Sequence, residues 1–311
     1  MKKLIYILGL IPFAFSCTKE LKNPSSLQQA ASINVNEATV SAVKFGVKFG
    51  DGNTTISEEI EVLKKLRTSY VRVPAESLKD YKGGNIAWID KAVPAGVKSL
   101  LCINWERAGR VRRFPRDLAL YETQLRKLLN KYASKIEVAI CENEPTTDKF
   151  FGDDPVKYYI AELKVFTRVC NEYGVKCADG GIHTENIKLV ISGKLDAIKN
   201  APQVKELLDA YKTIPMTYVN IHFKVSSSGF SSGELKNISD YIRNYTGRSG
   251  VLSNEMHSPP NDLTILKNVM SQVKEAQFAY ALKWSGGDYD SPVNKGTTLT
   301  SYGTSYKSLI P

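Results

Sequence analysis

Short runs of consecutive apolar residues recur along the chain from residue 42 onward, separated by longer segments. Continuous apolar runs, as opposed to alternating ones, are typical of parallel strands that are covered on both faces. The pattern therefore predicts eight buried parallel strands, at residues 42–49, 70–74, 98–104, 136–141, 176–178, 218–223, 250–253 and 276–283.

The segments between these runs carry helix start signals and apolar stripes. Thr55 and Glu58 have the spacing of a capping box, and Asp117 can cap a second helix. Asp154 followed by Pro155 predicts the start of a third helix. Apolar residues then recur every three or four positions, as one buried helix face requires: Ile56, Ile60, Leu63 and Leu66 in the first helix.

Eight strand–helix units in residues 41–311 match the rhythm and size of a single (β/α)8 barrel. The alternative is an open, doubly wound sheet. That fold would place a glycine-rich phosphate loop after the first strand, and residues 49–53 (FGDGN) do not have the GxGxxG pattern. We therefore expect residues 41–311 to form one (β/α)8 barrel, which serves as the catalytic domain.

The first 40 residues predict export. Lys2 and Lys3 precede an apolar stretch, residues 4–15, that is too short to span a bilayer. Small residues then precede Cys17, which resembles a bacterial lipobox. We expect residues 1–16 to be a lipoprotein signal peptide, Cys17 to be lipidated, and residues 17–40 to form a flexible tether. An ordinary secretory signal with an incidental cysteine is the alternative.

The amino-acid composition changes this picture little, but the net charge limits the kinds of binding partner to be considered. The chain is 42% hydrophobic and 24% charged, which is ordinary for a globular protein, with a net charge of +10. Basic charge can indicate nucleic acid, a membrane surface or an acidic substrate. Export to the cell envelope argues against nucleic acid and favours a carbohydrate or another envelope component. We expect a monomer that contacts the membrane through its lipid only.

The remaining cysteines do not have metal-site spacing. Cys102 and Cys141 lie in apolar runs, as buried thiols do. Cys170 and Cys177 could form a disulfide in an oxidising compartment or could both be reduced, and the sequence leaves both possibilities open.

Polar residues follow the apolar runs at their carboxyl ends, where a (β/α)8 barrel places its active site. The fourth run leads into Asn143, Glu144 and Pro145, and the seventh leads into Asn254 and Glu255. Two carboxyl groups should therefore meet over one barrel mouth. Other polar or aromatic residues at strand ends are Arg72, Asn104, Trp105, Glu142, His183, His222, His257 and Trp284.

With these residues the sequence resembles the clan A glycoside hydrolases. Asn143-Glu144-Pro145 is similar to the acid/base motif of that clan, and Glu255 to its nucleophile position. Arg72 and Trp284 are similar to positions that line the cleavage subsite, and residues 299–306 to the closing segment. The resemblance implies a retaining glycosidase with Glu144 as acid/base, Glu255 as nucleophile, and no cofactor or metal.

The chemistry explains why two carboxyl groups are needed. One protonates the leaving oxygen while the other attacks the anomeric carbon, at a separation of about 5–5.5 Å in retaining enzymes. We expect burial and the neighbouring carboxylate to raise the pKa of Glu144, and Arg72 to keep Glu255 ionised. Asn143 should bond the sugar 2-hydroxyl, and Trp284 and Trp105 should offer faces to sugar rings. Asn104 and His222 are further predicted substrate contacts.

One feature of the sequence departs from the clan A pattern, and two others can be interpreted in more than one way. Many clan members carry a tyrosine near the sixth strand that bonds the nucleophile, and residues 219–224 have none in its usual place, so the orienting partner of Glu255 stays open. Residues 105–116 hold five arginines, which would suit an anionic glycan or form a solvated basic loop. The three histidines suggest a metal site only weakly, because residues 44–49 contain no histidine.

The sequence thus predicts a lipid-anchored retaining glycosidase that acts on an oligosaccharide or polysaccharide, which could be anionic. A non-catalytic glycan-binding lipoprotein on the same barrel is the alternative, since fold does not fix function. A metal-dependent hydrolase is a third possibility.

Overall fold

The computed structural model describes residues 42–50, 54–108, 111–152, 154–197, 199–223, 225, 228–258, 262–286 and 291–311. The predicted signal peptide, Cys17 and the tether lie outside these residues. Within the described part of the chain, no helix has both the length and the apolar character that a membrane crossing requires.

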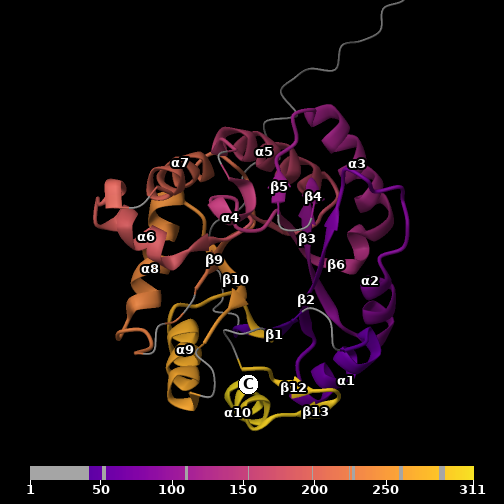
Figure 1. Cartoon of the computed structure of the whole chain (residues 1–311), viewed down its shortest axis with the longest axis vertical. Coiled ribbons are helices and arrows are strands. Elements are labelled where there is room, and N and C mark those ends of the chain that lie inside the picture. Colours follow the sequence, from indigo (N-terminus) through magenta and orange to yellow (C-terminus); the bar gives the residue numbers. More distant parts are fainter. Residues whose placement is uncertain are drawn as a thin grey trace, which may run out of the picture. The chain divides into compact units, whose positions relative to one another are not determined.

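Eight parallel strands form a closed barrel, as predicted, and helices surround it (Figure 1). Each strand pairs with the next in sequence, and the last pairs with the first, so the sheet has no free edge. The barrel strands are β1 (Lys44–Phe49), β2 (Tyr70–Ser77), β3 (Lys98–Asn104), β6 (Ile136–Cys141), β7 (Cys177–Ala178), β9 (Tyr218–His222), β10 (Gly250–Met256) and β11 (Tyr280–Ser285).

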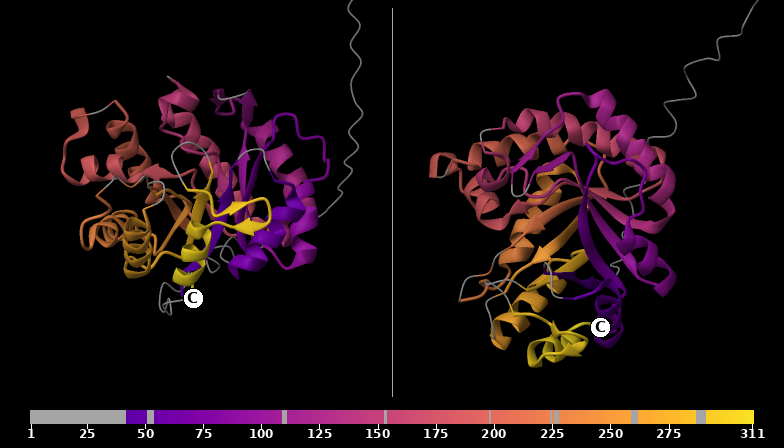
Figure 2. Two further views of the ribbon diagram at one scale, coloured as in Figure 1. Left: turned by 60° about the horizontal axis from the view of Figure 1, so that its bottom comes forward. Right: turned by 45° about the vertical axis from the view of Figure 1, so that its right-hand side comes forward.

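The outer helices follow these strands in turn. They are α1 (Ile56–Leu66), α2 (Ala87–Ala92), α3 (Leu118–Tyr132), α4 (Asp148–Phe151), α5 (Val156–Glu172), α6 (Thr184–Ile191), α7 (Ala201–Tyr211), α8 (Glu234–Thr246), α9 (Leu263–Glu275) and α10 (Ser301–Leu309). Short 3-10 helices span Val93–Ala95, Ala133–Lys135 and Leu195–Ala197. Figure 2 shows α10, in yellow, at the close of the chain, where it packs against α1 and α9.

Two short hairpins and one short strand lie outside the eight barrel strands. The strands β4 (Glu106–Ala108) and β5 (Val111–Arg113) form an antiparallel hairpin after β3. The strand β8 (Ile182–His183) pairs with the end of β9, opposite Ile221 and His222. The strands β12 (Asn294–Lys295) and β13 (Thr298–Leu299) form a second hairpin before α10.

The helix caps follow the sequence in two of three cases. Thr55 and Glu58 form the capping box of α1, and Asp117 caps α3. The prediction that Asp154 caps α5 is wrong. Its carboxylate instead accepts the backbone N–H of Phe114 and pairs with Arg116, so it ties the β5–α3 connection to α5.

Side chains alternate between two apolar layers, because successive residues of a strand point to opposite faces. Leu101 and Ile103 of β3 face the helices, whereas Leu100 and Cys102 belong to a small cluster inside the barrel. The inner cluster also contains Val138, Ile140, Ala178, Leu252, Tyr280 and Leu282. A packed interior closes the barrel centre, so ligands can enter only at an end.

All four described cysteines are free thiols and buried. Cys170 on α5 and Cys177 on β7 contact each other as thiols, which is one of the two states that the sequence left open.

Candidate active site

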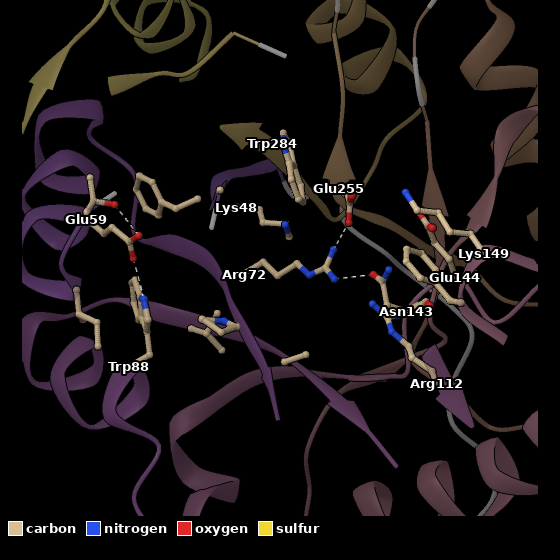
Figure 3. A pocket seen from close by; sticks show the side chains of 18 residues that line it. Lys48, Glu59, Arg72, Trp88, Arg112, Asn143, Glu144, Lys149, Glu255 and Trp284 are labelled. Carbon is tan, nitrogen blue, oxygen red and sulfur yellow. Dashed lines mark hydrogen bonds and ion pairs between the residues drawn. The ribbon is translucent and has the colours of Figure 1, made fainter. Parts of the chain in front are cut away.

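A cavity of about 670 Å³ lies at the carboxyl ends of the barrel strands (Figure 3). It brings together residues from β1, β2, β10 and β11 with the segment that follows β6, so residues far apart in the sequence share one wall. The polar and aromatic side chains that line it include Lys48, Glu59, Arg72, Trp88, Arg112, Asn143, Glu144, Lys149, Phe150, Glu255 and Trp284.

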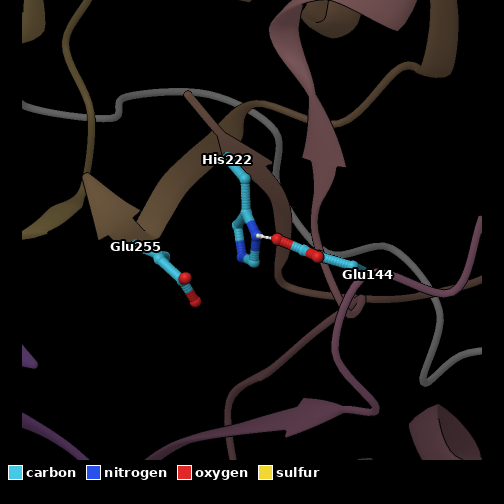
Figure 4. Close-up of side chains that lie close together, drawn as sticks. All are labelled: Glu144, His222 and Glu255. Carbon is cyan, nitrogen blue, oxygen red and sulfur yellow. Dashed lines mark hydrogen bonds and ion pairs between the residues drawn. The ribbon is translucent and has the colours of Figure 1, made fainter. Parts of the chain in front are cut away.

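The two predicted carboxylates meet in this cavity. Oxygen atoms of Glu144 and Glu255 and a ring nitrogen of His222 all lie within 4.8 Å of one another. Figure 4 shows the imidazole of His222 beside both carboxylates. A spacing of this size fits direct attack on a sugar by one carboxylate and leaves no room for a water between the two, as an inverting mechanism would need.

Glu255 is buried at the end of β10 and is surrounded by positive charge. The guanidinium of Arg72 forms an ion pair with Oε2, and Nε2 of His257 lies 3.1 Å from Oε1. Burial would raise the pKa of this carboxyl, but Arg72, His257, His222 and Lys48 together outweigh it. The pKa of Glu255 therefore lies well below its usual range.

A break in strand pairing brings Glu255 into the barrel. The register between β10 and β11 shifts between Ser253 and Met256. Beside that shift, two consecutive side chains both reach inward, since Asn254 contacts Cys102 and Glu255 contacts Arg72. A regular strand would have turned one of the two outward.

Glu144 has a different set of partners, namely two histidines. Its Oε1 lies 3.1 Å from Nδ1 of His222 and 3.2 Å from Nε2 of His183. Burial would raise the pKa of Glu144, but the hydrogen bonds from His183 and His222 outweigh it, and the pKa is lowered. The prediction of a raised pKa is therefore wrong for the free protein, because the sequence did not show that two imidazoles would face this carboxyl.

The same contact changes His183. Burial would lower the pKa of this imidazole, but the contact with the carboxylate of Glu144 and the charges of Glu185 and Glu255 together outweigh burial and raise it. The contact thus favours the charged forms of both partners, an imidazolium on His183 and a carboxylate on Glu144.

The side chains of Asn220 and Asn254 position His222 on the side of its ring away from Glu144. Its Nε2 lies 2.6 Å from Oδ1 of Asn254, which also accepts a bond from Nδ2 of Asn220 at 3.0 Å. Since that oxygen can only accept, Nε2 of His222 carries a hydrogen and Nδ1 faces Glu144. Gly181 makes this position possible, because a Cβ there would lie 2.3 Å from Nε2 of His222.

The segment after β6 directs three adjacent side chains in three directions. Glu142 and Glu144 both have left-handed backbone conformations, with φ of 64° and 52°. The side chain of Asn143 between them accepts a bond from Nη2 of Arg72 at 2.5 Å. Non-glycine residues in this conformation carry strain of about 1–3 kcal/mol each, and such strain clusters at functional sites.

Glu142 turns away from the cavity. It is fully buried and accepts the backbone N–H of Trp105 at 2.6 Å. Burial raises the pKa of Glu142 to about 8, and the pKa of the buried Glu162 on α5 is also raised well above its usual value. Glu142 is not among the residues that line the cavity, although it precedes Asn143 and Glu144 directly in the chain.

Trp284 at the end of β11 forms an aromatic wall. The ring of His257 stacks on it, with ring centroids 5.3 Å apart, and Nζ of Lys48 lies 2.8 Å from its centroid. Lys48 and Trp284 stand opposite each other in the β1–β11 register.

The other residues that were predicted to contact the substrate do not line the cavity. Asn104 and Trp105 are buried and are not among the residues that line the cavity, and the ring of Trp105 packs against Tyr121. His222 lies behind Glu144 and contacts it. Their roles in substrate binding stay predictions.

The arginine-rich segment splits up. Arg112 lines the cavity, where its Nη1 donates to the backbone oxygen of Asn143 at 2.7 Å and its guanidinium lies over the ring of Phe150. Arg116 instead pairs with Asp154, and Arg113 is exposed. The described arginines of this segment therefore do not face the cavity as one group, since a hairpin turns alternate residues to opposite sides. Arg110 and the side chain of Arg107 lie outside the described residues.

Sequence reasoning predicted Arg72 as the partner of Glu255 but missed the other partners of the two carboxylates. Lys48, His183 and His257 were not predicted to contact them. One signal was present: His257 stands two residues after Glu255, the spacing that puts strand neighbours on one face.

Within the described residues, Glu144, His222 and Glu255 are the one group whose donor atoms are close enough to hold a metal ion. The fixed charge of Arg72 on Glu255 and the bond between Glu144 and His222 already occupy these donors. The arrangement suits proton transfer better than a cation.

Neither a protein-family model nor a curated protein sequence matches the chain. Among solved structures it is similar to a glucosidase from Croceicoccus marinus, with 11% identity and a TM-score of 0.66 over 86% of this chain and 67% of that one. It is also similar to a GH39 beta-xylosidase from Caulobacter crescentus, with 13% identity and a TM-score of 0.58 over 86% and 72% of the two chains.

A third similar structure is a mutant GH128 endo-beta-1,3-glucanase from Amycolatopsis mediterranei in complex with laminaripentaose. The identity is 11% and the TM-score 0.54, over 86% of this chain and 99% of that one. The chain thus spans about two thirds of the glucosidase and nearly all of the glucanase. These likenesses establish the (β/α)8 fold.

Proposed function

We propose that the protein is a retaining glycoside hydrolase that cleaves an oligosaccharide or polysaccharide with Glu255 as nucleophile and Glu144 as acid/base. The observation that carries this proposal is the approach of the two carboxylates within 4.8 Å in one cavity. The names of the similar structures support it, because they include a glucosidase, a xylosidase and a glucanase with a bound oligosaccharide.

Glu255 has the properties of a nucleophile. Arg72 keeps it ionised and His257 fixes its orientation. In the first step an oxygen of Glu255 attacks the anomeric carbon, the glycosidic C–O bond breaks, and the leaving oxygen takes a proton from Glu144. The product is a glycosyl ester on Glu255.

Glu144 needs a proton for this step, and its two imidazole partners can supply it. Nε2 of His183 lies 3.2 Å from Oε1 of Glu144, and this contact raises the pKa of the imidazole, which favours a proton on His183. We infer that it passes to Glu144 as the leaving oxygen gains negative charge. In the second step Glu144 accepts a proton from water, the hydroxyl oxygen attacks the anomeric carbon, and Glu255 is released.

Asn143 and Trp284 complete the subsite in this proposal. Asn143 is oriented by Arg72 so that its amide can meet the sugar 2-hydroxyl, a contact that strengthens in the transition state. Trp284 supplies an apolar wall. We also propose that the protein acts in the bacterial cell envelope, attached through lipidated Cys17.

The test begins with purified protein and a panel of neutral and acidic glycans. Glu144→Gln and Glu255→Gln should each lower kcat on the best substrate by at least about a hundredfold. Glu59→Gln is the matched control, since Glu59 lines the same cavity but bonds Thr54 and Trp88 on its far side. It should retain activity within a few fold.

Azide separates the two roles. With an activated aryl glycoside, azide should restore turnover of Glu144→Ala and give a glycosyl azide of retained configuration, whereas Glu255→Ala should give the inverted product. If both glutamine variants hydrolyse as fast as the original protein, the proposal fails. If no glycan is cleaved but some bind, the protein is a glycan-binding protein on this barrel.

A further inference from the structure

The connection between β7 and β8, residues 179–181, contacts Glu144 and one of its imidazole partners. The backbone N–H of Glu144 donates to the carbonyl oxygen of Gly180 at 2.9 Å. Gly181 lies against the ring of His222, and β8, which begins at the next residue, carries the second imidazole. A movement of this short connection would therefore shift Glu144 relative to both of its partners.

This connection also interrupts the pairing of β9 with its neighbours. Ala178 pairs with Tyr218, and Ile182 pairs with Ile221. Three residues thus lie between these pairs on one side and two on the β9 side, which leaves one extra residue, as in a β-bulge. The next pair of β8 and β9 is formed by the two histidines that contact Glu144. The register that follows the break therefore sets where both imidazoles stand.

The carboxylate of Asp179 closes this break. The residue is fully buried. Its Oδ1 accepts the backbone N–H of Asn220 at 2.6 Å, and its Oδ2 accepts that of Gly181 at 3.0 Å. Since a buried N–H without an acceptor is costly, the side chain of Asp179 supplies the acceptors that the interrupted strand pairing lacks.

Asn220 links Asp179 to His222 through Asn254. Its Nδ2 donates to Oδ1 of Asn254 at 3.0 Å, and its Oδ1 accepts the backbone N–H of Asn254 at 3.2 Å. The same oxygen of Asn254 accepts Nε2–H of His222, whose Nδ1 faces Glu144 (Figure 4). Asp179 thus reaches the carboxyl of Glu144 through a series of hydrogen bonds, although it is not among the residues that line the cavity.

We propose that Asp179 is the positioning residue of the acid/base, and that its carboxylate holds residues 179–181 in the conformation that aligns His183 and His222 with Glu144. This inference rests on the proposed glycosidase function and adds to it a residue that does not touch the substrate. Burial raises the pKa of Asp179 to about 6, against the effect of the two N–H donors, so the carboxylate is ionised at pH 7.5.

Asp179→Asn tests this role, because an amide offers one acceptor oxygen and one NH2 group to two backbone donors. The experiment measures kcat/KM at pH 7.5 for two glycosides of the same sugar. One has a dinitrophenyl leaving group, which departs without a proton, and the other has an alkyl leaving group, which needs one. The variant should lose about ten- to a hundredfold on the alkyl glycoside and less than about threefold on the dinitrophenyl glycoside.

Two further variants accompany this measurement. Glu137→Gln is the matched control, because Glu137 is a carboxylate at the start of β6 that bonds Tyr280 and Lys176, away from the connection. It should change both rates by the same factor. Gly181→Ala alters the connection without a change of charge, since its Cβ would lie 2.3 Å from Nε2 of His222. It should reproduce the selective loss, and it keeps the test valid should Asp179→Asn fold poorly.

Nitrogen-15 spectra of the imidazoles give a readout that needs no activity, since the chain has three histidines. In Asp179→Asn and in Gly181→Ala the pKa of His183 should fall from its raised value toward the ordinary value of about 6.5. Agreement between the two variants separates an effect of position from an effect of charge. The signals of His257, which contacts Glu255, should not move.

Two results would overturn the proposal. One is an equal loss on both leaving groups in Asp179→Asn, and the other is histidine signals that match those of the original protein in both variants. If the original protein cleaves no glycoside, the glycosidase function fails. The histidine spectra then still decide whether Asp179 holds the two imidazoles in place.

Discussion

The side chains of Glu144 and Glu255 are buried to a similar degree, but they differ in the residues that pair with them. Glu255 faces Arg72, whose charge does not change in the accessible pH range. Glu144 faces the imidazoles of His183 and His222, and its carboxylate raises the pKa of His183. Both carboxyls have lowered pKa values in the free protein, for these two different reasons.

This difference matters more than the direction of either pKa. A fixed cation keeps a nucleophile permanently ionised. Titratable partners can accept a proton from a carboxyl and return it, as an acid/base needs during two successive steps. The contrast between arginine and histidine therefore separates the two roles better than burial does.

The largest expected effect comes from removal of the fixed cation. Arg72→Met should destabilise the protein by about 3–5 kcal/mol, because it leaves the buried carboxylate of Glu255 without its partner. Urea denaturation measures this. The difference from the original protein should not decrease as pH rises from 6 to 9, because the original pair stays charged there and the unpaired Glu255 of the variant becomes more costly as it ionises. A difference that falls steadily as pH rises across this range would contradict the fixed-charge assignment.

Removal of a titratable partner should instead give a pH-dependent effect. His183 has a raised pKa, so its bond to Glu144 contributes fully below the ordinary histidine pKa of about 6.5 and is lost as pH rises through the raised value. Glu144 has a lowered pKa, so the same bond is lost under strong acid. His183→Gln should cost about 1–3 kcal/mol near pH 6 and much less near pH 9.

Urea denaturation across this pH range measures the effect of His183→Gln. A cost that does not vary between pH 6 and 9 would show that the imidazole acts without its charge, and the comparison with Arg72 would lose its basis.

A smaller effect is expected at the residue that orients the nucleophile. His257→Phe keeps a ring against Trp284 but removes the contact of Nε2 with Oε1 of Glu255. We expect kcat to fall about tenfold with little change in KM, because a lost positioning contact acts on the transition state. Unchanged kcat would mean that Arg72 alone orients the nucleophile.

The smallest effect concerns Glu142, the fully buried carboxyl beside the cavity. Burial raises the pKa of Glu142 to about 8, so the original protein loses stability as pH rises through that value. Glu142→Gln keeps an oxygen for the N–H of Trp105 and cannot ionise. Its melting temperature should match the original near pH 5 and exceed it near pH 9. An equal alkaline loss in both proteins would place the ionisation elsewhere.

The sequence was sufficient for the barrel and for the carboxylate pair, because both follow from local patterns. Eight apolar runs set the strand count, and Asn-Glu after the fourth and seventh runs places Glu144 and Glu255 at one end. The partners of those carboxylates depend on geometry that the sequence does not display. Glycine at position 181 gives His222 its room, and a register shift turns Glu255 inward.

The arginine segment shows the same limit. Composition put five arginines near the site, but strand pairing in a hairpin decides which of them face it, and of these Arg112 lines the described cavity. Asp154 shows this limit as well. The sequence predicted that it caps a helix, but its carboxylate instead accepts the backbone N–H of Phe114, which is distant in the sequence.

The left-handed backbone at Glu144 has a consequence for how such a protein could change over time. Glycine adopts this conformation without strain, so the relief at the backbone would offset part of the stability lost with the contacts to His183 and His222 if glycine replaced Glu144. In the proposed mechanism that single replacement removes the acid/base, so a descendant could keep the fold and the cavity while it lost the ability to cut a bound sugar.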